Sequence, residues 1–215
     1  MEEYKTILAS SEANLEIKKS MFIARAKAVE NEDQAVDFID QVRRENRQAN
    51  HNCYAYIIGA NKGIQRYSDD NEPQGTAGLP ILGVLKSEDL TNICLVVTRY
   101  FGGVKLGASG LIRAYSKASS LALEEADLVF MKKYLKINLS IDYTLLGKVE
   151  NYILTNRYFE ISRDYTDKVT IYLYISEKEF EKFEKDIVEL SSGKLRIEID
   201  KKLLLAEKNR KIIGG

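Results

Sequence analysis

The order of hydrophobic patterns in the second half of the sequence constrains the fold more than any other feature. Four segments alternate apolar and polar residues, which is the period of a half-buried strand, and two segments between them carry apolar residues at helical spacing. The predicted strands are residues 133–141, 158–165, 168–176 and 195–199, and the predicted helices are residues 145–153 and 180–190. This βαββαβ order predicts an α+β, ferredoxin-like domain, with two helices on one face of a four-stranded antiparallel sheet.

Two helix starts carry the pattern of a capping box. Asn31 with Gln34 opens a predicted helix over 32–45, and Ser176 with Glu179 precedes the second helix of the ferredoxin-like pattern. In a capping box the first side chain accepts a hydrogen bond from the backbone N–H three residues later. We therefore expect Asn31 and Ser176 to cap the helices that follow them.

The first half mixes strands and helices in a different order. Its predicted strands are residues 14–18, 22–29, 53–58, 64–68 and 93–98, and its predicted helices are residues 32–45, 77–86 and 108–126. No Pro- or Ser-rich linker separates the halves, so the change of pattern places the boundary near residues 130–133. We expect domains at 1–132 and 133–205, and we expect residues 206–215, AEKNRKIIGG, to form a loose tail.

The charge balance excludes a global field that attracts nucleic acid or anionic lipid. Lys plus Arg equals Asp plus Glu, at 32 each, so binding to either must come from a local patch. The sequence has no apolar run of about 18 residues for a membrane span. Its first ten residues also lack the basic and apolar regions of an export signal. We expect a cytoplasmic protein with no membrane partner.

Unusual residues concentrate between positions 51 and 110, which hold nine of the 13 glycines, both prolines, both cysteines and the single histidine. Within this region the segment 98–113, TRYFGGVKLGASGLIR, reads as a buried strand, a glycine-rich turn and a helix start. Backbone amides of such a turn, with the positive end of the helix, form an anion site. Ala108 stands where a phosphate loop requires Lys, so a P-loop NTPase is not indicated.

Cations near this turn are the first candidates for binding phosphate or a partner. Cations in the first turns of a helix oppose its dipole unless an anion sits nearby. The alternative is that these cations pair internally with acidic residues, and the sequence leaves both open. The candidate binding set is Arg66, Arg99, Gly102, Gly103, Lys105, Gly107, Ser109, Arg113 and Lys117.

An acidic loop precedes the turn in the sequence. Asp69, Asp70 and Glu72 can bind a hard cation, or they can order the loop and pair with the arginines. Three carboxylates without calcium-loop spacing do not make a complete site. We therefore expect no metal and no cofactor.

Four further residues are lesser candidates. His51 and Cys53 fall on one face of a strand, but no orienting third group is identifiable, so a hydrogen-bonded histidine at a strand end is the favoured interpretation. Cys53 lies in an apolar run, as Cys94 does, and both are predicted to be structural thiols. Tyr172 and Tyr174 lie on the strand face opposite the helices, where aromatic residues stack RNA bases in some folds. The alternative is that both tyrosines face solvent or pack on the first domain.

Four segments of the sequence resemble the IMPACT family in its bacterial, YigZ-type form. They are IKKSMFIARAKAV, HNCYAYIIG, YSDDNEPQGTAGLPIL and VVTRYFGGVKLGASGLIRAYSKA. The resemblance implies a ribosomal-protein S5 domain 2-like first domain followed by the ferredoxin-like domain. Eukaryotic members are implied to act in translational control by competing for the ribosome-associated activator of an initiation-factor kinase. That partner is not carried over, because the RWD-type domain of those members is not recognised here.

Three functions remain open. The first is a non-enzymatic module in translation-related regulation that binds RNA or the ribosome through the glycine-rich basic loop. The second is an enzyme or sensor of a small phosphorylated ligand or nucleotide, with Asp69 or Asp70 as base or metal ligand. The third is a scaffold whose glycine-rich loop docks a protein partner. We favour the first and assign no catalytic residue.

Overall fold

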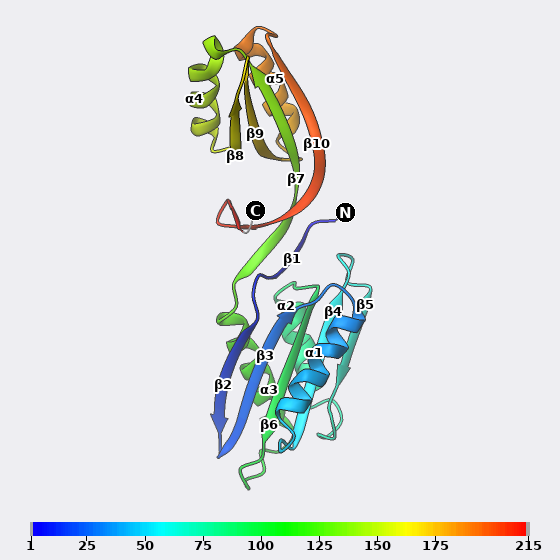
Figure 1. The fold of residues 1–215 in the computed structure, drawn as a ribbon. Coiled ribbons are helices and arrows are strands. Elements are labelled where there is room, and N and C mark those ends of the chain that lie inside the picture. Colours follow the sequence, from blue (N-terminus) through cyan, green and yellow to red (C-terminus); the bar gives the residue numbers. More distant parts are fainter. Residues whose placement is uncertain (1, 214–215) are drawn as a thin grey trace. The chain divides into compact units, whose positions relative to one another are not determined.

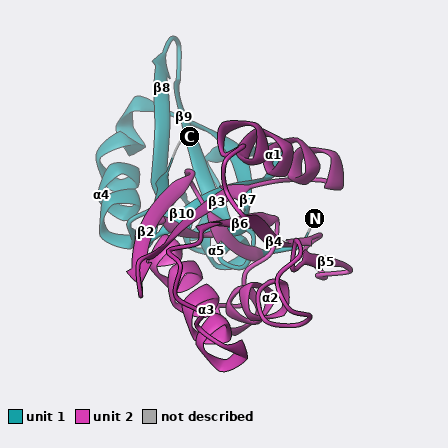
Figure 2. Cartoon of the chain, turned by 90° about the horizontal axis from the view of Figure 1, so that it is seen from below, with its two compact units in different colours: residues 1–3, 131–215 teal, residues 4–130 magenta. Residues whose placement is uncertain are grey.

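The computed structural model describes residues 2–213 and divides into two compact units. One unit comprises residues 4–130, and the other comprises residues 131–215 with the first residues of the chain. Figure 2 distinguishes the two units by colour. The boundary falls inside one strand, β7 (Leu128–Ile141). The described residues form an α+β fold with two sheets of antiparallel strand pairs and five α-helices.

The unit of residues 4–130 is built on one sheet with the strand order β2-β3-β6-β4-β5. All four neighbouring pairs are antiparallel. The strands of this unit are β1 (Tyr4–Ile7), β2 (Ser11–Ile17), β3 (Ser20–Ala28), β4 (His51–Ile58), β5 (Ile64–Ser68) and β6 (Ile93–Tyr100). The helices are α1 (Glu32–Glu45), α2 (Gly78–Ser87) and α3 (Ala108–Glu124). Helix α1 covers one face of the sheet, and α2 and α3 cover the other (Figure 1).

Strand β6 is central to this unit because both of its faces are buried. Leu95 and Val97 pack into the core shared with α2 and α3, and Cys94 and Val96 pack into the core under α1. Burial on both faces explains why this strand reads as a continuous apolar run instead of alternating. The free thiols of Cys53 and Cys94 are buried on opposite faces. Both side chains are fully buried, which confirms the prediction of structural thiols, and this burial raises the pKa of each.

The second unit pairs a sheet with two helices. Its strand order is β11-β10-β7-β9-β8. The further elements are η1 (Tyr143–Leu145), α4 (Leu146–Asn156), β8 (Phe159–Tyr165), β9 (Val169–Ser176), α5 (Phe180–Ser191), β10 (Leu195–Lys208) and β11 (Lys211–Ile213). Alternate residues of β9, such as Ile171 and Leu173, are fully buried with Val149 of α4 and Phe183 of α5. The helices therefore cover one face, and the intervening residues of each strand project from the other.

The prediction of a loose tail is wrong for residues 206–213, and residues 214 and 215 lie outside the described part of the chain. Residues 206–208 end β10, and Lys211–Ile213 forms β11, which pairs antiparallel with it in the register Ala206↔Ile213. Asn209 and Arg210 make the connecting two-residue turn with φ of 52° and 59°. Such a turn requires positive φ at both central residues, which favours asparagine at the first of them. The mostly polar composition of this segment does not indicate a hairpin, although its two isoleucines, Ile212 and Ile213, are half-buried.

Only one of the two predicted capping boxes forms. The Asn31 side chain accepts a hydrogen bond from the Gln34 backbone N–H at 2.9 Å, and the Gln34 amide oxygen accepts from the Glu30 N–H at 2.8 Å. Ser176 instead remains the last residue of β9, and α5 begins after Glu179 without a side-chain cap. Pairing of Ser176 with Tyr134 in the sheet holds its backbone extended, so Ser176 does not cap the helix, which begins at Phe180 as its apolar spacing predicts.

None of the helices in residues 2–213 is long and apolar enough to cross a membrane.

Candidate functional site

The glycine-rich segment connects the end of β6 to the start of α3, as predicted. A Cβ at Gly102 would lie 1.9 Å from the Lys19 carbonyl oxygen, so only glycine fits where the loop passes the β2–β3 turn. The Gly102 N–H also donates to the Ser20 hydroxyl at 3.2 Å. Gly107 is the N-cap of α3 with φ of 74° and ψ of 167°, a conformation that is essentially restricted to glycine. Two glycines of the predicted set thus shape the loop.

The start of α3 is an electropositive surface. Its first turn contains no acidic residue, and the N-cap supplies no side-chain hydrogen bond. The backbone N–H groups of residues 108–110 consequently lack an intrahelical acceptor. Lys105 and Arg113 are exposed, and neither forms an ion pair with any residue in 2–213. Lys117 is exposed and lies 3.9 Å from the Glu124 carboxylate.

Arg99, in contrast, is buried and neutralised inside the protein. Its side chain donates from Nη1 to the Glu72 Oε1 atom at 2.7 Å, and the two residues are only 5% and 8% exposed. The guanidinium lies 5.3 Å and 5.4 Å from the ring centroids of Phe22 and Phe101. Arg99 therefore pairs internally with the acidic loop, which is the alternative to phosphate binding that the sequence left open. It also supports the glycine-rich loop by packing against Phe101.

Glu72 joins β4, α3 and the acidic loop through one carboxylate. Its Oε1 atom also accepts a hydrogen bond from the Tyr115 hydroxyl at 2.8 Å. The His51 Nε2 atom lies 3.8 Å from the same oxygen, and His51 Nδ1 lies 2.8 Å from the Asp70 carbonyl oxygen. Burial raises the pKa of Tyr115, so its hydroxyl stays a neutral donor to this carboxylate.

The Cys53 thiol has its hydrogen-bond partners on α3 and in the acidic loop. Its Sγ atom lies 3.4 Å from the Tyr115 hydroxyl and 3.0 Å from the Asp69 carbonyl oxygen. The thiolate needed for nucleophilic attack is disfavoured by burial. The arrangement therefore lacks the features of a cysteine–histidine catalytic pair.

The two aspartates of the acidic loop are engaged by backbone donors. Asp69 accepts from the N–H groups of Gly75, Ala77 and Gly78 at 2.8–3.0 Å, which places its charge at the start of α2. Asp70 accepts from the Asn52 N–H at 2.6 Å. No group of three or more His, Cys, Asp or Glu side chains suited to a metal ion occurs in the described part of the chain. The acidic loop thus orders the fold.

The remaining candidates lie on other elements. Arg66 is an exposed residue of β5 whose Nε lies 3.7 Å from the Glu32 carboxylate of α1, on the sheet face opposite α3. Tyr172 and Tyr174 belong to the other unit. The Tyr172 hydroxyl donates to Asp164 at 2.9 Å.

Sequence reasoning missed several residues that hold the site. Tyr115 is the aromatic residue of α3 that faces the sheet, where its ring meets that of Phe22 edge-on at 5.3 Å. The Asn50 side chain accepts from the Phe101 N–H at 2.8 Å, and the Asn52 side chain accepts from the Thr98 hydroxyl at 2.8 Å. The sequence did carry a signal for Tyr115, since it is a tyrosine among small residues on the inner face of α3.

The fold and site define a two-unit α+β protein with a basic glycine-rich loop braced by a buried ion pair. Residues 18–123 match the Impact N-terminal domain, and residues 139–194 match a domain of unknown function, DUF1949. The chain is 42% identical over 194 residues to the IMPACT family member YvyE of Bacillus subtilis, covering 90% of this chain and 89% of that protein. It is 32% identical to the IMPACT family member YigZ of Escherichia coli, covering 85% and 90%.

The chain therefore belongs to the IMPACT family, in its bacterial, YigZ-type form. A crystal structure of a hypothetical protein has the same fold, with a TM-score of 0.60 and 30% sequence identity, covering 94% of this chain and 98% of that one. A more distant relative, the protein IMPACT homolog of Saccharomyces cerevisiae, is 33% identical over 91 residues, covering 41% of this chain and 35% of that protein.

Proposed function

We propose that this protein is a non-enzymatic module in translation-related regulation that binds RNA or the ribosome through its loop surface. We define the loop surface as residues 101–107 with the exposed cations Lys105, Arg113 and Lys117. The observation that carries the proposal is the absence of acidic partners for Lys105 and Arg113 among residues 2–213, beside a helix start with open N–H groups. A phosphate backbone supplies the missing negative charge.

The role of Arg99 differs from that of a phosphate ligand. Because it is buried against Glu72, it shapes the loop surface and does not reach a ligand from solvent. The proposal therefore rests on three exposed cations, which is a modest charge. Weak binding to free RNA, with a salt dependence set by about three phosphates, is the expected behaviour.

The other two functions receive unequal support. An enzyme that uses Asp69 or Asp70 as base or metal ligand is poorly supported, because both carboxylates already accept backbone hydrogen bonds. A protein-docking scaffold is the second candidate, since Phe101 and Val104 of the loop surface are 44% and 41% exposed. Apolar side chains beside cations are also typical of protein interfaces.

The finer fold assignments belong to the same proposal. The βαββαβ element order of the second unit and its antiparallel pairs support a ferredoxin-like domain. The S5 domain 2-like assignment of the first unit rests on the family resemblance. We place this role in the cytoplasm.

The test is sedimentation of the tagged full chain with ribosomes from a gently lysed extract, at low and high salt. The variant Lys105→Glu with Arg113→Glu reverses two charges of the loop surface. Lys86→Glu with Lys194→Glu is the matched control, because both lysines are exposed and lie outside that surface. Salt-sensitive co-sedimentation that is lost only in the loop variant supports the proposal.

Salt dependence supplies the quantitative form of the test. Three neutralised phosphates on a single strand predict a loss of about 20-fold in affinity between 50 and 200 mM salt, at a slope of about 0.7 per phosphate. The loop variant keeps one of the three cations and should lose only about threefold. Binding that is equally strong in wild type and loop variant contradicts RNA contact through this surface. A complex that survives nuclease and moderate salt indicates the docking scaffold.

A further inference from the structure

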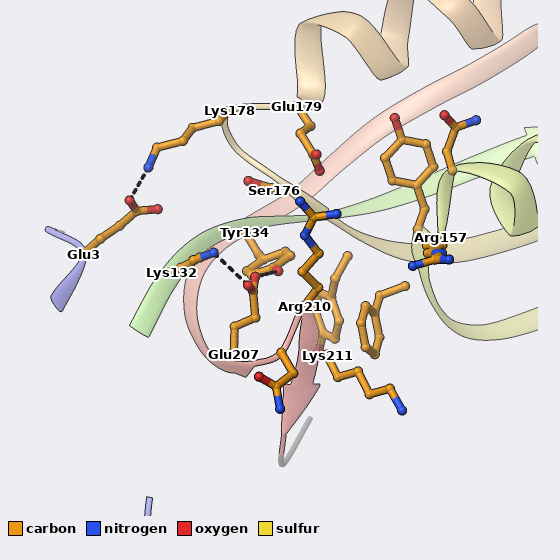
Figure 3. Close-up of a pocket in the computed structure, with 15 residues that line it drawn as sticks. Glu3, Lys132, Tyr134, Arg157, Ser176, Lys178, Glu179, Glu207, Arg210 and Lys211 are labelled. Atoms are coloured by element: carbon orange, nitrogen blue, oxygen red, sulfur yellow. Dashed lines mark hydrogen bonds and ion pairs between the residues drawn. The ribbon is translucent and has the colours of Figure 1, made fainter. Parts of the chain in front are cut away.

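A pocket of about 720 Å³ lies in the second unit (Figure 3). None of its lining residues belongs to the loop surface. It is bordered by β7, β9, the start of β8, the end of α4 and the β10–β11 hairpin. Tyr134, Tyr174 and Ser176 line it and alternate along their strands with residues of the helix-covered core. The pocket therefore opens on the sheet face opposite the helices. Its size suits a small organic ligand.

The charge of the pocket favours an anion. Five cationic and three acidic side chains line it, a net charge of +2. Lys132 pairs with Glu207 at 2.7 Å, and Lys178 pairs with Glu3 (Figure 3). The cations without an ion pair to any residue in 2–213 are Arg157, Arg210 and Lys211. Besides Glu3, two acidic side chains share the pocket with these three cations: Glu179, and Glu207, which pairs with Lys132 and also interacts electrostatically with Arg210.

The two arginines hold backbone conformations that favour glycine or asparagine. Arg157 caps the end of α4 with φ of 57° and ψ of 39°. Arg210 is the second central residue of the β10–β11 turn, with φ of 59°, where glycine is the usual residue. A left-handed conformation is unfavourable for any residue that has a Cβ atom. Both positions follow the end of an element, α4 and β10, so each guanidinium is carried by a tight turn that borders the pocket.

Aromatic rings lie beside these cations. Phe159 of β8 and Tyr174 of β9 are direct cross-strand neighbours, and both line the pocket half-buried. Neighbouring rings at the wall of a cationic pocket offer a surface on which a planar base can stack. Phosphate and base recognition are thus available in one pocket.

We propose that this pocket binds a nucleotide, with its phosphate held by Arg157, Arg210 and Lys211 and its base against Phe159 and Tyr174. The same chemistry has two sources, a free nucleotide or one nucleotide of a single-stranded RNA. The proposal goes beyond the proposed function and does not depend on it, because the pocket and the loop surface belong to different units and share no residue.

The first experiment is calorimetric titration of the full chain at low salt with ADP, inorganic phosphate and hexauridylate. The variant Arg157→Asn with Arg210→Asn removes two cations but keeps residues that tolerate left-handed backbone. We expect saturable binding of ADP or of hexauridylate, weakened about tenfold or more by this variant. Ser192→Asn, at a left-handed position outside the pocket with φ of 55°, is the matched control and should leave affinity unchanged.

The probes distinguish the two sources. Binding of ADP indicates a free-nucleotide site, and binding of hexauridylate without ADP indicates an RNA segment. Tyr174→Leu should lower the affinity for whichever larger probe binds by about tenfold, while the affinity for inorganic phosphate stays unchanged. If inorganic phosphate binds as tightly as both larger probes do, the proposed stacking of a base on the two rings is overturned. Absence of binding by both larger probes, or equal affinity in the double-asparagine variant, overturns the proposal.

Arg210→Gly separates ligand binding from a structural role. Relief of the left-handed conformation should raise the melting temperature of the full chain while ADP or RNA affinity falls. A fall in both would show that Arg210 is a structural residue and would contradict the inference. Lys105→Glu with Arg113→Glu should leave pocket affinity unchanged, so failure of the loop proposal is distinguishable from failure of this one.

Discussion

The ion pair between Arg99 and Glu72 makes the most stringent prediction about this structure. Both side chains are nearly inaccessible to solvent, and the Glu72 carboxylate also accepts a hydrogen bond from the Tyr115 hydroxyl. Glu72→Ala leaves the Arg99 charge buried without a counter-charge. Breaking a buried pair in this way costs about 3–5 kcal/mol. The variant also leaves the Tyr115 hydroxyl without its acceptor, because the Cys53 thiol donates to that hydroxyl and cannot accept in place of Glu72.

The measurement is urea unfolding followed by far-ultraviolet circular dichroism, since the chain contains no tryptophan. Hydrogen exchange should localise the destabilisation to residues 4–130, the unit that holds the pair. A loss of about 4 kcal/mol corresponds to a fall of roughly 8–16 °C in the melting temperature at 2–4 °C per kcal/mol. Because that fall is large, modest scatter between preparations does not obscure it.

A double-mutant cycle isolates the pair from the packing around it. Arg99→Met replaces the guanidinium with an apolar side chain that can still lie between the rings of Phe22 and Phe101. Glu72→Gln combined with Arg99→Met removes both charges, so the double variant should be more stable than the sum of the single variants predicts. We expect a coupling of about 2 kcal/mol or more. Additive effects, or a cost below about 1 kcal/mol for Glu72→Ala, would refute the argument that the charges depend on each other.

Two further predictions concern the loop and the core under α1. Gly102→Ala should lower the free energy of unfolding by about 1–3 kcal/mol more than Gly83→Ala, because its Cβ would overlap the Lys19 carbonyl, whereas Gly83 has open space and no left-handed backbone. Equal effects in thermal melts would contradict the close approach. Burial, with the hydrogen bond to Glu32, raises the pKa of Tyr56 to about 12. The neutral phenol is therefore favoured in the folded protein, and its stabilising contribution, present below the unfolded pKa near 10, is lost as pH rises through 12. Ultraviolet phenolate titration of wild type and Glu32→Gln should show one tyrosine that ionises earlier in the variant, and identical curves would refute this assignment.

Much of the element order followed from local patterns. Alternation and helical spacing predicted the βαββαβ segment, and the continuous apolar run at 93–98 matched a strand buried on both faces. The Asn31 cap also formed as predicted, because its donor lies three residues away and nothing competes for it. Ser176 carried the same signal but stayed in its strand, since pairing with β7 was a stronger constraint than a local cap.

For the candidate site, too, local patterns predicted some features and the tertiary structure decided others. Residue types and spacing located the glycine-rich turn, the acidic loop and their cations, but they left open which cations pair internally. Arg99 and Glu72 are 27 residues apart, and their contact depends on how a sheet, a loop and α3 converge. Lys105 and Arg113, unlike Arg99, face solvent in the folded protein.

The sequence by itself therefore determined most of the order of secondary structure and the region that holds the loop surface, and four of its segments identified the family by resemblance. The order of elements depends on periodicity and local hydrogen bonds, which act over a few residues. Only the tertiary structure decided that Arg99 is buried, that residues 206–213 form a hairpin edge, and that Arg157 and Arg210 line one pocket. Such outcomes depend on the burial and approach of segments distant in the chain, and no local pattern encodes the desolvation that selects among them.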